Sequence, residues 1–386
     1  MDGRVYAGKN STGGRMKNKI INKVTELLPN LVEDIKTICN IDSRQGIADE
    51  GSPFGRGIAE CLEKALELAS KLGFETENAE NRVGIVSFGP DTEEYIACVG
   101  HLDVVDIHGN WKTEPFVCTE IDGTLYARGV LDNKGPIFCC LYALKVLVDL
   151  RYQFPVKVKI FFGTNEENGM EDMKWYFKNH KFPLMGWTPD CKYPVIYAER
   201  GRAVYDYSVS KEYLGELVAF VNQYILNQSE LDVSLGVDYS DEEFGKNQIR
   251  KAELHYDDET CGITLVCSYP ASYNLKEMEK RLKKKCTKHM SLCLKSDLKP
   301  VFFEKESYLI KTLEKVYEEI MQEEGKAVTT TGGTYAKVVR NIVPFGPSFK
   351  GQKGIGHLPN EWMRICDIEK NTQIYAYALY ELMNGL

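Results

Sequence analysis

The stretch Tyr95-Ile-Ala-Cys-Val-Gly-His-Leu-Asp103 joins a short apolar run to two polar side chains that can bind metals, and it decides the fold class of this chain. Its first five residues are typical of a buried strand. The same arrangement recurs where the apolar run Val156–Phe162 is followed by Glu166 and Glu167. Ligands bind beyond the carboxyl ends of strands in open α/β sheets, so these polar groups are predicted to share one crevice.

Helical periodicity alternates with these short apolar runs, which predicts an α/β sheet with helices on its faces. The expected helices are Ile20–Cys39, Gly57–Leu72, Pro136–Leu150, Tyr308–Gly325 and Asp367–Met383, and Val195–Ala198 is a further expected strand.

After Gly201 the pattern changes to β-α-β-β-α-β, which predicts an inserted α+β domain. Its expected elements are Ala203–Ser210, Glu212–Asn227, Ile249–Tyr256, Gly262–Tyr269, Leu275–Cys286 and Met290–Leu294. We therefore expect a flexible polar tail over residues 1–18, a main domain formed by 19–201 and 300–386, and an inserted lid domain over 202–299.

The composition excludes several classes of protein. The chain has 386 residues, of which 27% are charged and 43% hydrophobic, as in ordinary globular proteins. A net charge of -8 argues against nucleic acid or an anionic membrane surface as a partner. The most apolar stretch, Pro136–Leu150, is too short for a membrane span. Twelve cysteines without a C-x-x-C pair, behind a polar N-terminus without a secretory h-region, predict free thiols in a cytoplasmic protein.

Three further loops carry residues that can bind a metal, namely Asp132, Asp190 and His357. Together with the groups after the two strands they provide two imidazoles and several carboxylates. Zn²⁺ accepts both donor types, and one carboxylate can bridge two ions. Two such ions would acidify a shared water and polarise a carbonyl, while a spare carboxylate takes the proton. Each group alone has an ordinary structural explanation, because charged side chains are mostly exposed. Their conjunction in loops at strand ends favours a dinuclear hydrolase.

Five segments resemble the co-catalytic zinc metallopeptidase family, which includes carnosinases, aminoacylases and succinyl-diaminopimelate desuccinylase. The segments are Gly100–Val105, Ala127–Pro136, Gly163–Gly169, Thr188–Gly201 and Thr331–Ala336. They are most similar to the bacterial Xaa-His dipeptidase (dipeptidase V) branch. The resemblance implies a zinc-peptidase-like catalytic domain with a mixed sheet flanked by helices, and an inserted lid.

The resemblance also implies a role for each candidate residue. His101 and Asp190 would bind one metal, Glu167 and His357 the other, and Asp132 both. Zn²⁺ is the first expectation for these two ions, with Mn²⁺ or Co²⁺ as alternatives. Glu166 would be the general base, and Asp103 would orient His101. The Asp132–Asn133 peptide bond is expected to be cis, and Asn133 is also a candidate for substrate binding.

Two departures from the family pattern concern the substrate side of the site. The lid usually carries a Gly-x-x-Ala-His-x-Ser-x-Pro segment whose His stabilises the oxyanion, and this short lid lacks it, which leaves His255 as a candidate substitute. Lys337 stands where the dipeptidase branch has an Arg that holds the substrate carboxylate. Arg340 is expected on the same face if the segment is helical, and Gly332 and Gly333 complete the expected substrate-binding set.

The leading hypothesis is a metal-dependent hydrolase, a monomer or homodimer, that cleaves the amide bond of dipeptides or short peptides with a free carboxylate. An N-acyl amino acid deacylase would use the same metal ligands. A peptide-binding protein with impaired catalysis is the alternative of another class, because the lid histidine is missing.

Overall fold

The computed structural model describes residues 7–352 and 354–386, with side chains from residue 14 onward. The chain forms two compact units. Unit 1 comprises Met1–Ile196, Lys305–Ala327 and Thr334–Leu386, and unit 2 comprises Tyr197–Glu304 and Val328–Gly333. Unit 2 thus includes a short segment after residue 327 that the sequence division assigns to the main domain. The physical reason is that this segment, as strand β17 (Val328–Thr330), pairs with strand β9 (Ile196–Glu199).

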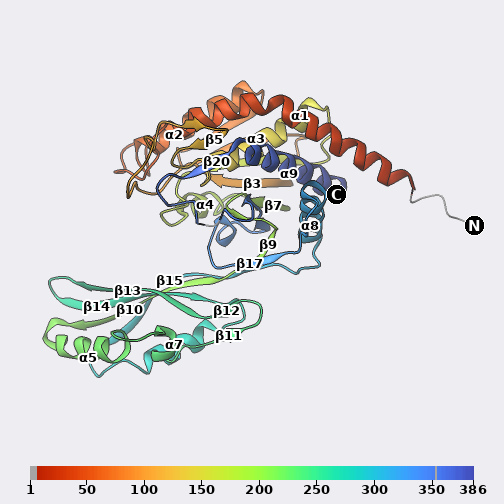
Figure 1. Ribbon diagram of the computed structural model, residues 1–386. Coiled ribbons are helices and arrows are strands. Elements are labelled where there is room, and N and C mark those ends of the chain that lie inside the picture. Colours follow the sequence, from red (N-terminus) through yellow and green to blue (C-terminus); the bar gives the residue numbers. More distant parts are fainter. Residues whose placement is uncertain (1–6, 353) are drawn as a thin grey trace, which may run out of the picture. The chain divides into compact units, whose positions relative to one another are not determined.

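Unit 1 is built on a six-stranded mixed sheet in the order β1-β2-β6-β3-β7-β18 (Figure 1). The strands are β1 (Glu75–Ala79), β2 (Val83–Phe88), β3 (Tyr95–His101), β6 (Lys157–Gly163), β7 (Met185–Thr188) and β18 (Ile342–Pro344). Strand β3 runs parallel to β6 and β7, and β18 runs parallel to β7, whereas β1 and β2 are antiparallel additions. The carboxyl ends of the parallel strands therefore meet at one edge of the sheet, as the sequence predicts.

The central strands and one helix explain why the main sheet forms. All seven residues of β3 are buried, as are nearly all residues of α3 (Lys134–Asp149), which packs on β3 and β6. Helix α3 lies between α1 (Ala7–Cys39) and α9 (Ile365–Asn384) on the same side of the sheet (Figure 1). Apolar strands covered by such a helix layer are the arrangement expected of parallel sheets.

The remaining elements of unit 1 surround this core. They are α2 (Arg56–Lys71), α4 (Glu171–Tyr176), α8 (Tyr308–Met321), a short 3₁₀ turn η2 (Tyr335–Lys337), a three-stranded sheet of β4 (Thr119–Ile121), β5 (Thr124–Tyr126) and β20 (Trp362–Arg364), and the pair β8 (Cys191–Lys192) and β19 (Pro347–Ser348).

The first helix is longer than the sequence indicates. Helix α1 begins at Ala7, so it includes much of the segment 1–18 that we expect to be a tail, while residues 1–6 lie outside the described part of the chain. Its first turns contain glycine and polar residues, which weaken helix propensity without forbidding a helix. Strands β1 and β2 also escape the sequence analysis, because β1 is a polar edge strand without an apolar alternation.

Unit 2 has a four-stranded antiparallel sheet in the order β13-β14-β10-β15 (Figure 1). Its strands are β10 (Gly201–Ser210), β13 (Gln248–Tyr256), β14 (Thr260–Tyr269) and β15 (Ser291–Leu298), and its main helices are α5 (Leu214–Tyr224) and α7 (Leu275–Lys283). A core of side chains such as Tyr205, Phe220 and Leu265 is buried between sheet and helices. The predicted β-α-β-β-α-β order is confirmed.

Smaller elements complete unit 2. They are the 3₁₀ turn η1 (Lys211–Tyr213), the short helix α6 (Leu231–Ser234), the hairpin of β11 (Ser240–Asp241) and β12 (Gly245–Lys246), and β16 (Val301–Phe302), which pairs with β9.

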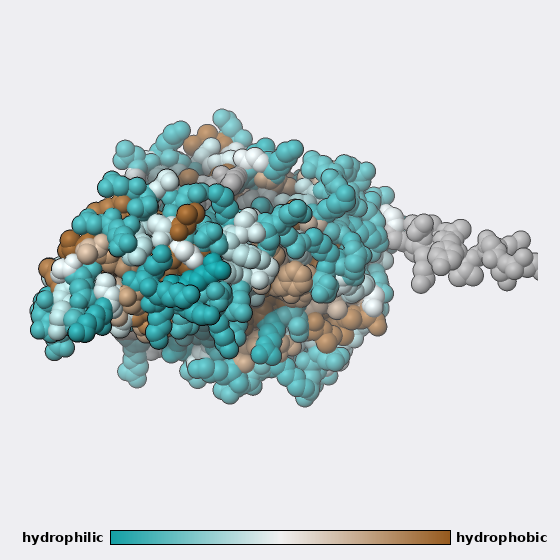
Figure 2. Space-filling model, turned by 90° about the horizontal axis from the view of Figure 1, so that it is seen from below, coloured by the Kyte–Doolittle hydropathy of each residue, from teal (hydrophilic) through white to brown (hydrophobic). Residues whose placement is uncertain are grey.

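The face shown in Figure 2 is mainly hydrophilic, with hydrophobic residues in small groups. Among the described helices, none has the length and apolar character needed to cross a membrane.

Candidate metal centre

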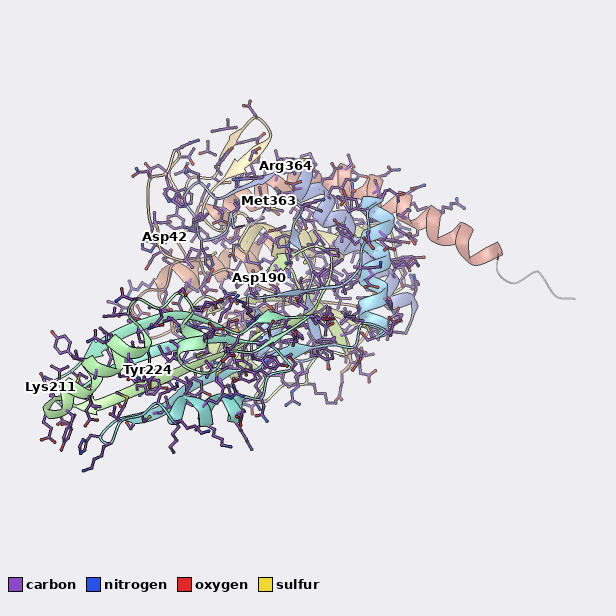
Figure 3. The ribbon with its side chains drawn as sticks, turned by 60° about the horizontal axis from the view of Figure 1, so that its bottom comes forward. Asp42, Asp190, Lys211, Tyr224, Met363 and Arg364 are labelled. Carbon is purple, nitrogen blue, oxygen red and sulfur yellow. The ribbon has the colours of Figure 1, made fainter. Side chains whose placement is uncertain are left out.

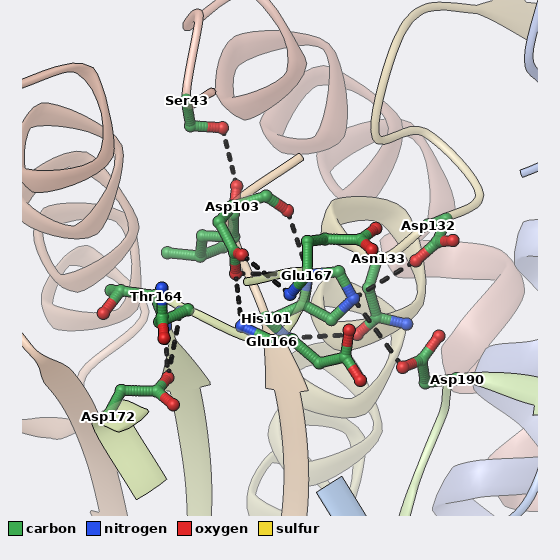
Figure 4. Close-up of polar contacts among 12 residues, drawn as sticks. Ser43, His101, Asp103, Asp132, Asn133, Thr164, Glu166, Glu167, Asp172 and Asp190 are labelled. Atoms are coloured by element: carbon green, nitrogen blue, oxygen red, sulfur yellow. Dashed lines mark hydrogen bonds and ion pairs between the residues drawn. The ribbon is translucent and has the colours of Figure 1, made fainter. Parts of the chain in front are cut away.

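The candidate residues converge at the carboxyl edge of the main sheet. His101 is the last residue of β3 and pairs across the sheet with Gly163, the last residue of β6, so the loop after β6 begins beside it. Asp132 precedes α3, and Asp190 lies in the loop between β7 and β8 (Figures 3 and 4). His357 comes from the loop between β19 and β20 and has a left-handed backbone with φ of 67°.

Asp132 stands between the two imidazoles. Its Oδ1 lies 3.1 Å from Nε2 of His101, and its Oδ2 lies 3.1 Å from Nε2 of His357. The His101 Nε2 atom is also 3.7 Å from Oδ2 of Asp190, and the His357 Nε2 atom is 2.8 Å from Oε1 of Glu167. The five side chains thus form two three-residue groups that share Asp132, and each oxygen of that carboxylate serves one group.

Asp103 organises the backbone of this edge. Its backbone carbonyl accepts from the other nitrogen of His101, Nδ1, at 2.9 Å, while its carboxylate is more distant at 3.4 Å. The carboxylate oxygens instead accept the backbone N–H groups of Glu166 at 3.1 Å and Glu167 at 3.0 Å (Figure 4). Asp103 therefore fixes both the imidazole tautomer and the loop that carries the two glutamates.

Burial and mutual repulsion raise the pKa of three carboxyl groups in the cluster. The pKa values of Glu166 and Asp190 lie well above their usual range, because burial penalises the charged forms and neighbouring carboxylates repel them. Glu167 is raised for the same two reasons, burial and the charge of Asp132. Four acidic groups within one buried cluster thus carry more negative charge than the protein surroundings balance.

The imidazoles respond in the opposite direction. Hydrogen bonds to Asp132 and Glu167 raise the pKa of His357 to about 11. Burial works against protonation of His101, but its contacts with Asp103 and Asp132 keep its pKa well above the usual value. At Asp132, burial alone would raise the pKa, but the hydrogen bonds from both imidazoles outweigh this effect and hold the pKa well below its usual value.

This donor set fits divalent metal ions. The sets His101, Asp132, Glu167 and His101, Glu166, Asp190 each bring three potential ligand atoms within 4.8 Å of one another. The buried Oε1 atom of Glu166 has no hydrogen-bond partner among the described residues. Nitrogen and carboxylate donors of this kind suit Zn²⁺ and related ions, which would also balance the excess negative charge.

Asn133, a candidate for substrate binding, holds backbone groups of the site together. Its side chain is fully buried. Its Oδ1 accepts the backbone N–H of His101 at 3.2 Å, and its Nδ2 donates to the carbonyl of Pro189 at 2.6 Å. The peptide bond between Asp132 and Asn133 is cis, as the resemblance implies. Because both ends of the amide make hydrogen bonds to backbone groups, Asn133 joins three loops of the site, and its part in substrate binding stays a prediction.

Arg340 also lies away from the cluster. The helical turn of the motif ends at Lys337, and the chain then enters β18, where Ile342 pairs with Gly186 near the beginning of β7. The Arg340 guanidinium stacks over Phe182, with its central carbon 5.2 Å from the ring centroid. This contact lies close to the amino end of β3. The expectation that Arg340 shares a face with Lys337 is wrong, because the helical spacing does not continue past the turn.

The remaining expected residues lie in different units. Lys337 is a half-buried member of unit 1, whereas Gly332 and Gly333 belong to unit 2. In the lid, β10 ends at Ser210 and only the turn η1 precedes α5, so the segment that usually carries the lid histidine has no place here. His255 lies on β13, with Nε2 2.6 Å from Oδ1 of the buried Asp206. Its contribution to catalysis stays a prediction.

One buried carboxyl group near the site was not singled out from the sequence. Asp172 accepts the backbone N–H groups of Thr164 at 2.7 Å (Figure 4) and Asn165 at 3.1 Å. It also accepts the hydroxyl of Tyr335. Burial raises the pKa of Asp172 to about 6. It ties the Glu166 loop to the Tyr335 turn. It lies in the first turn of α4, where acidic side chains are common because they interact favourably with the helix dipole, so the sequence carried no distinguishing signal.

Fold and cluster together define a mixed α/β protein with a cluster of potential metal ligands at the carboxyl edge of its main sheet. The chain matches the sequence pattern of "Peptidase family M20/M25/M40" over residues 97–381 and belongs to this family. The predicted family and fold class are thereby confirmed.

Two curated relatives show similarity over almost their whole length. "Putative dipeptidase YtjP" of Bacillus subtilis (strain 168) is 26% identical, with 91% of this chain and 97% of the relative covered. "Beta-Ala-Xaa dipeptidase" of Lactobacillus delbrueckii subsp. lactis is 25% identical, with 91% and 96% covered. The first alignment extends over 451 residues although the chain has 386, so that relative contains segments without a counterpart here.

Solved structures share the fold. Human carnosine dipeptidase 1 aligns with a TM-score of 0.68 at 16% identity, covering 96% of this chain and 99% of the other. The YXEP protein of Bacillus subtilis, described as a dinuclear metal binding peptidase, aligns with a TM-score of 0.65 at 11% identity, covering 94% of this chain and all of the other.

Proposed function

We propose that this family member hydrolyses the amide bond of dipeptides or short peptides that carry a free carboxylate, and that it uses two divalent metal ions. The observation that carries the proposal is the placement of Asp132, whose two carboxylate oxygens each lie 3.1 Å from a different imidazole. The names of the curated relatives, both dipeptidases, support the peptide substrate.

The distances favour one assignment of ligands. His101 and Asp190 would hold one ion, His357 and Glu167 the other, and Asp132 both, because the contacts between these side chains separate into two groups. When bound, two such ions acidify a water molecule and polarise the scissile carbonyl. Zn²⁺ suits the mixture of nitrogen and oxygen donors, and Mn²⁺ and Co²⁺ are the alternatives that reconstitution would distinguish.

Glu166 is the proposed general base. Its side chain lies beside His101 and Asp190, and its buried Oε1 has no hydrogen bond within the described residues. A carboxylate in this position can take the proton of the attacking water and return it to the leaving amine. Asp103 holds the backbone N–H of Glu166 and accepts from His101 through its carbonyl, so its proposed role is to position both.

Lys337 is the proposed binder of the substrate carboxylate. As a point charge it would hold the carboxylate without the planar, bidentate contact of an arginine. We expect Lys337→Met to raise KM for dipeptides at least tenfold while Lys337→Arg preserves binding. An unchanged KM in Lys337→Met would contradict this role.

The cell compartment that fits best is the cytoplasm, because all twelve cysteines, which lie within the described residues, are free thiols.

The test of the proposed function is hydrolysis of a mixed panel of dipeptides and N-acyl amino acids by protein stripped of metal and reloaded in turn with Zn²⁺, Mn²⁺ or Co²⁺. We expect metal-dependent cleavage of dipeptides. Glu166→Gln should lower kcat by about 10²–10⁴-fold. Glu171→Gln is the matched control, since that exposed carboxylate only pairs with Lys174 at 2.7 Å. Turnover without metal, or of N-acyl compounds alone, would overturn the proposal.

A further inference from the structure

A fully buried carboxylate, Glu361, accepts several hydrogen bonds from the loop that carries Asp132. Its Oε1 accepts the backbone N–H groups of Leu131 at 2.8 Å and Asp132 at 3.0 Å. Its Oε2 accepts the N–H of Gly129 at 3.1 Å and Nη1 of Arg128 at 2.8 Å. Four donors thus converge on one side chain, and three of them are consecutive or nearly consecutive backbone groups of the same loop.

Further contacts hold this pair in place. The backbone carbonyl of Glu361 accepts the N–H of Ala127 at 3.2 Å, so the main chain and the side chain of Glu361 both form hydrogen bonds with the same loop. The Arg128 guanidinium is also buried and stacks on Trp111, with the ring centroid at 5.1 Å. A buried ion pair of this kind is held by its surroundings, and loss of one partner leaves the other charge unpaired.

Glu361 is also close in sequence to the second imidazole. It follows His357 by four residues, and both side chains point to the same loop, His357 to the Asp132 carboxylate and Glu361 to the Asp132 backbone. The segment 357–361 therefore fixes the position of one proposed ligand, Asp132, and carries another, His357. A shift of the Glu361 carboxylate moves Asp132 relative to both imidazoles.

We infer that Glu361 is a positioning residue for metal binding: it fixes the backbone of Asp132 so that each carboxylate oxygen faces a different imidazole. The inference rests on the proposed function, because it concerns the shared ligand of the two ions. Sequence reasoning did not single out Glu361. Residues that orient metal ligands affect affinity by about 10–100-fold when replaced.

The pattern of loss identifies the role. In Glu361→Gln an amide NH₂ replaces one oxygen and faces N–H donors, so the loop loses two of its four hydrogen bonds. Because Asp132 would serve both ions, we expect both metal affinities to fall in parallel, by about 10–100-fold. His357→Ala should differ, since it removes a ligand of one ion and leaves the other ion bound.

The experiment is a competition titration of metal-free full-length protein with Zn²⁺ and a chromophoric chelator, which gives stoichiometry and both affinities, together with the Tm of each metal-free variant. Asp34→Asn is the matched control. Asp34 accepts the Tyr142 hydroxyl at 2.6 Å between helices α1 and α3, so its replacement lowers stability without touching the loop. It should leave both Zn²⁺ affinities unchanged.

Parallel weakening in Glu361→Gln with unchanged affinities in Asp34→Asn supports the inference. Unchanged affinities in a folded Glu361→Gln protein, or weakening of one ion alone, overturn it. If Glu361→Gln does not fold, Glu361→Asp decides: wild-type affinities in that shortened side chain overturn the inference, and parallel weakening supports it.

The outcome separates this inference from the proposed function. Wild-type protein that binds two ions but cleaves no peptide defeats the proposed function and leaves the role of Glu361 intact. Wild-type protein that cleaves dipeptides, with equal metal affinities in Glu361→Gln, defeats the inference alone. Wild-type protein without affinity for Zn²⁺, Mn²⁺ or Co²⁺ defeats both.

Discussion

Replacement of Asn133 by alanine should destabilise the protein and impair turnover together. The side chain links the His101 backbone N–H to the Pro189 carbonyl, with bonds of 3.2 Å and 2.6 Å. Asn133→Ala leaves one buried donor and one buried acceptor unpaired, each at a cost of about 1–3 kcal/mol. We therefore expect the free energy of unfolding to fall by about 2–6 kcal/mol, which lowers Tm by about 2–7 °C.

The assay measures Tm by thermal unfolding and kcat and KM with a dipeptide at a temperature where both proteins are folded. The main loss should appear in kcat, because the altered loops carry His101 and Asp190, whereas KM should change little. Asn179→Ala, at an exposed position, is the control for loss of an asparagine side chain. An unchanged Tm with a raised KM would refute the reasoning, because that is the signature of a substrate-binding residue.

Three further predictions concern other parts of the molecule. Arg340→Ala should leave KM unchanged and cost about 0.5–1 kcal/mol of stability through the lost stacking on Phe182; a tenfold rise in KM would contradict its placement. Gly163→Ala should lower Tm and kcat, because an added Cβ would lie 2.0 Å from the Tyr335 hydroxyl, and overpacking of this kind costs about 1–3 kcal/mol; wild-type values would contradict the contact. Hydrogen bonds from the lid lower the pKa of Glu216 to about 2 from an ordinary 4.5, so they stabilise the fold above pH 4.5 and the effect is lost as the pH falls toward 2. Glu216→Gln should therefore be less stable than wild type at neutral pH. In unfolding measurements as a function of pH this difference in stability should vanish toward pH 2, and a difference that is the same at all pH values would contradict the lowered pKa of Glu216.

The sequence could predict the ligand cluster because the relevant signal is local. The apolar strand β3 ends at His101, and β6 ends just before the two glutamates, so strand direction alone places them at one edge. The motif around His357 adds a residue whose partners lie more than 150 positions away, and there the family resemblance supplied what spacing could not.

Residues that act through backbone contacts could not be predicted in the same way. Asn133 and Glu361 make hydrogen bonds to main-chain N–H and C=O groups. Nearly every residue carries these groups, so the type of the partner residue gives no sign of the contact. The error at Arg340 has a different cause. Helical spacing was extended beyond Lys337, but the turn ends there and the chain enters a strand in which Ile342 pairs with Gly186.

The position of Glu361 after unit 2 in the chain has a consequence for biosynthesis. Loop 127–133 leaves the ribosome long before its carboxylate partner does, since the complete unit 2 is translated between them. Domains generally fold as units during synthesis, with N-terminal parts first. In this chain the Asp132 loop gains its anchor only after Glu361 has been synthesised. A ribosome-stalled chain that ends before residue 357 would thus lack both His357 and the anchor of the Asp132 loop, so we expect the proposed metal ions to bind only after the segment 357–361 has been synthesised.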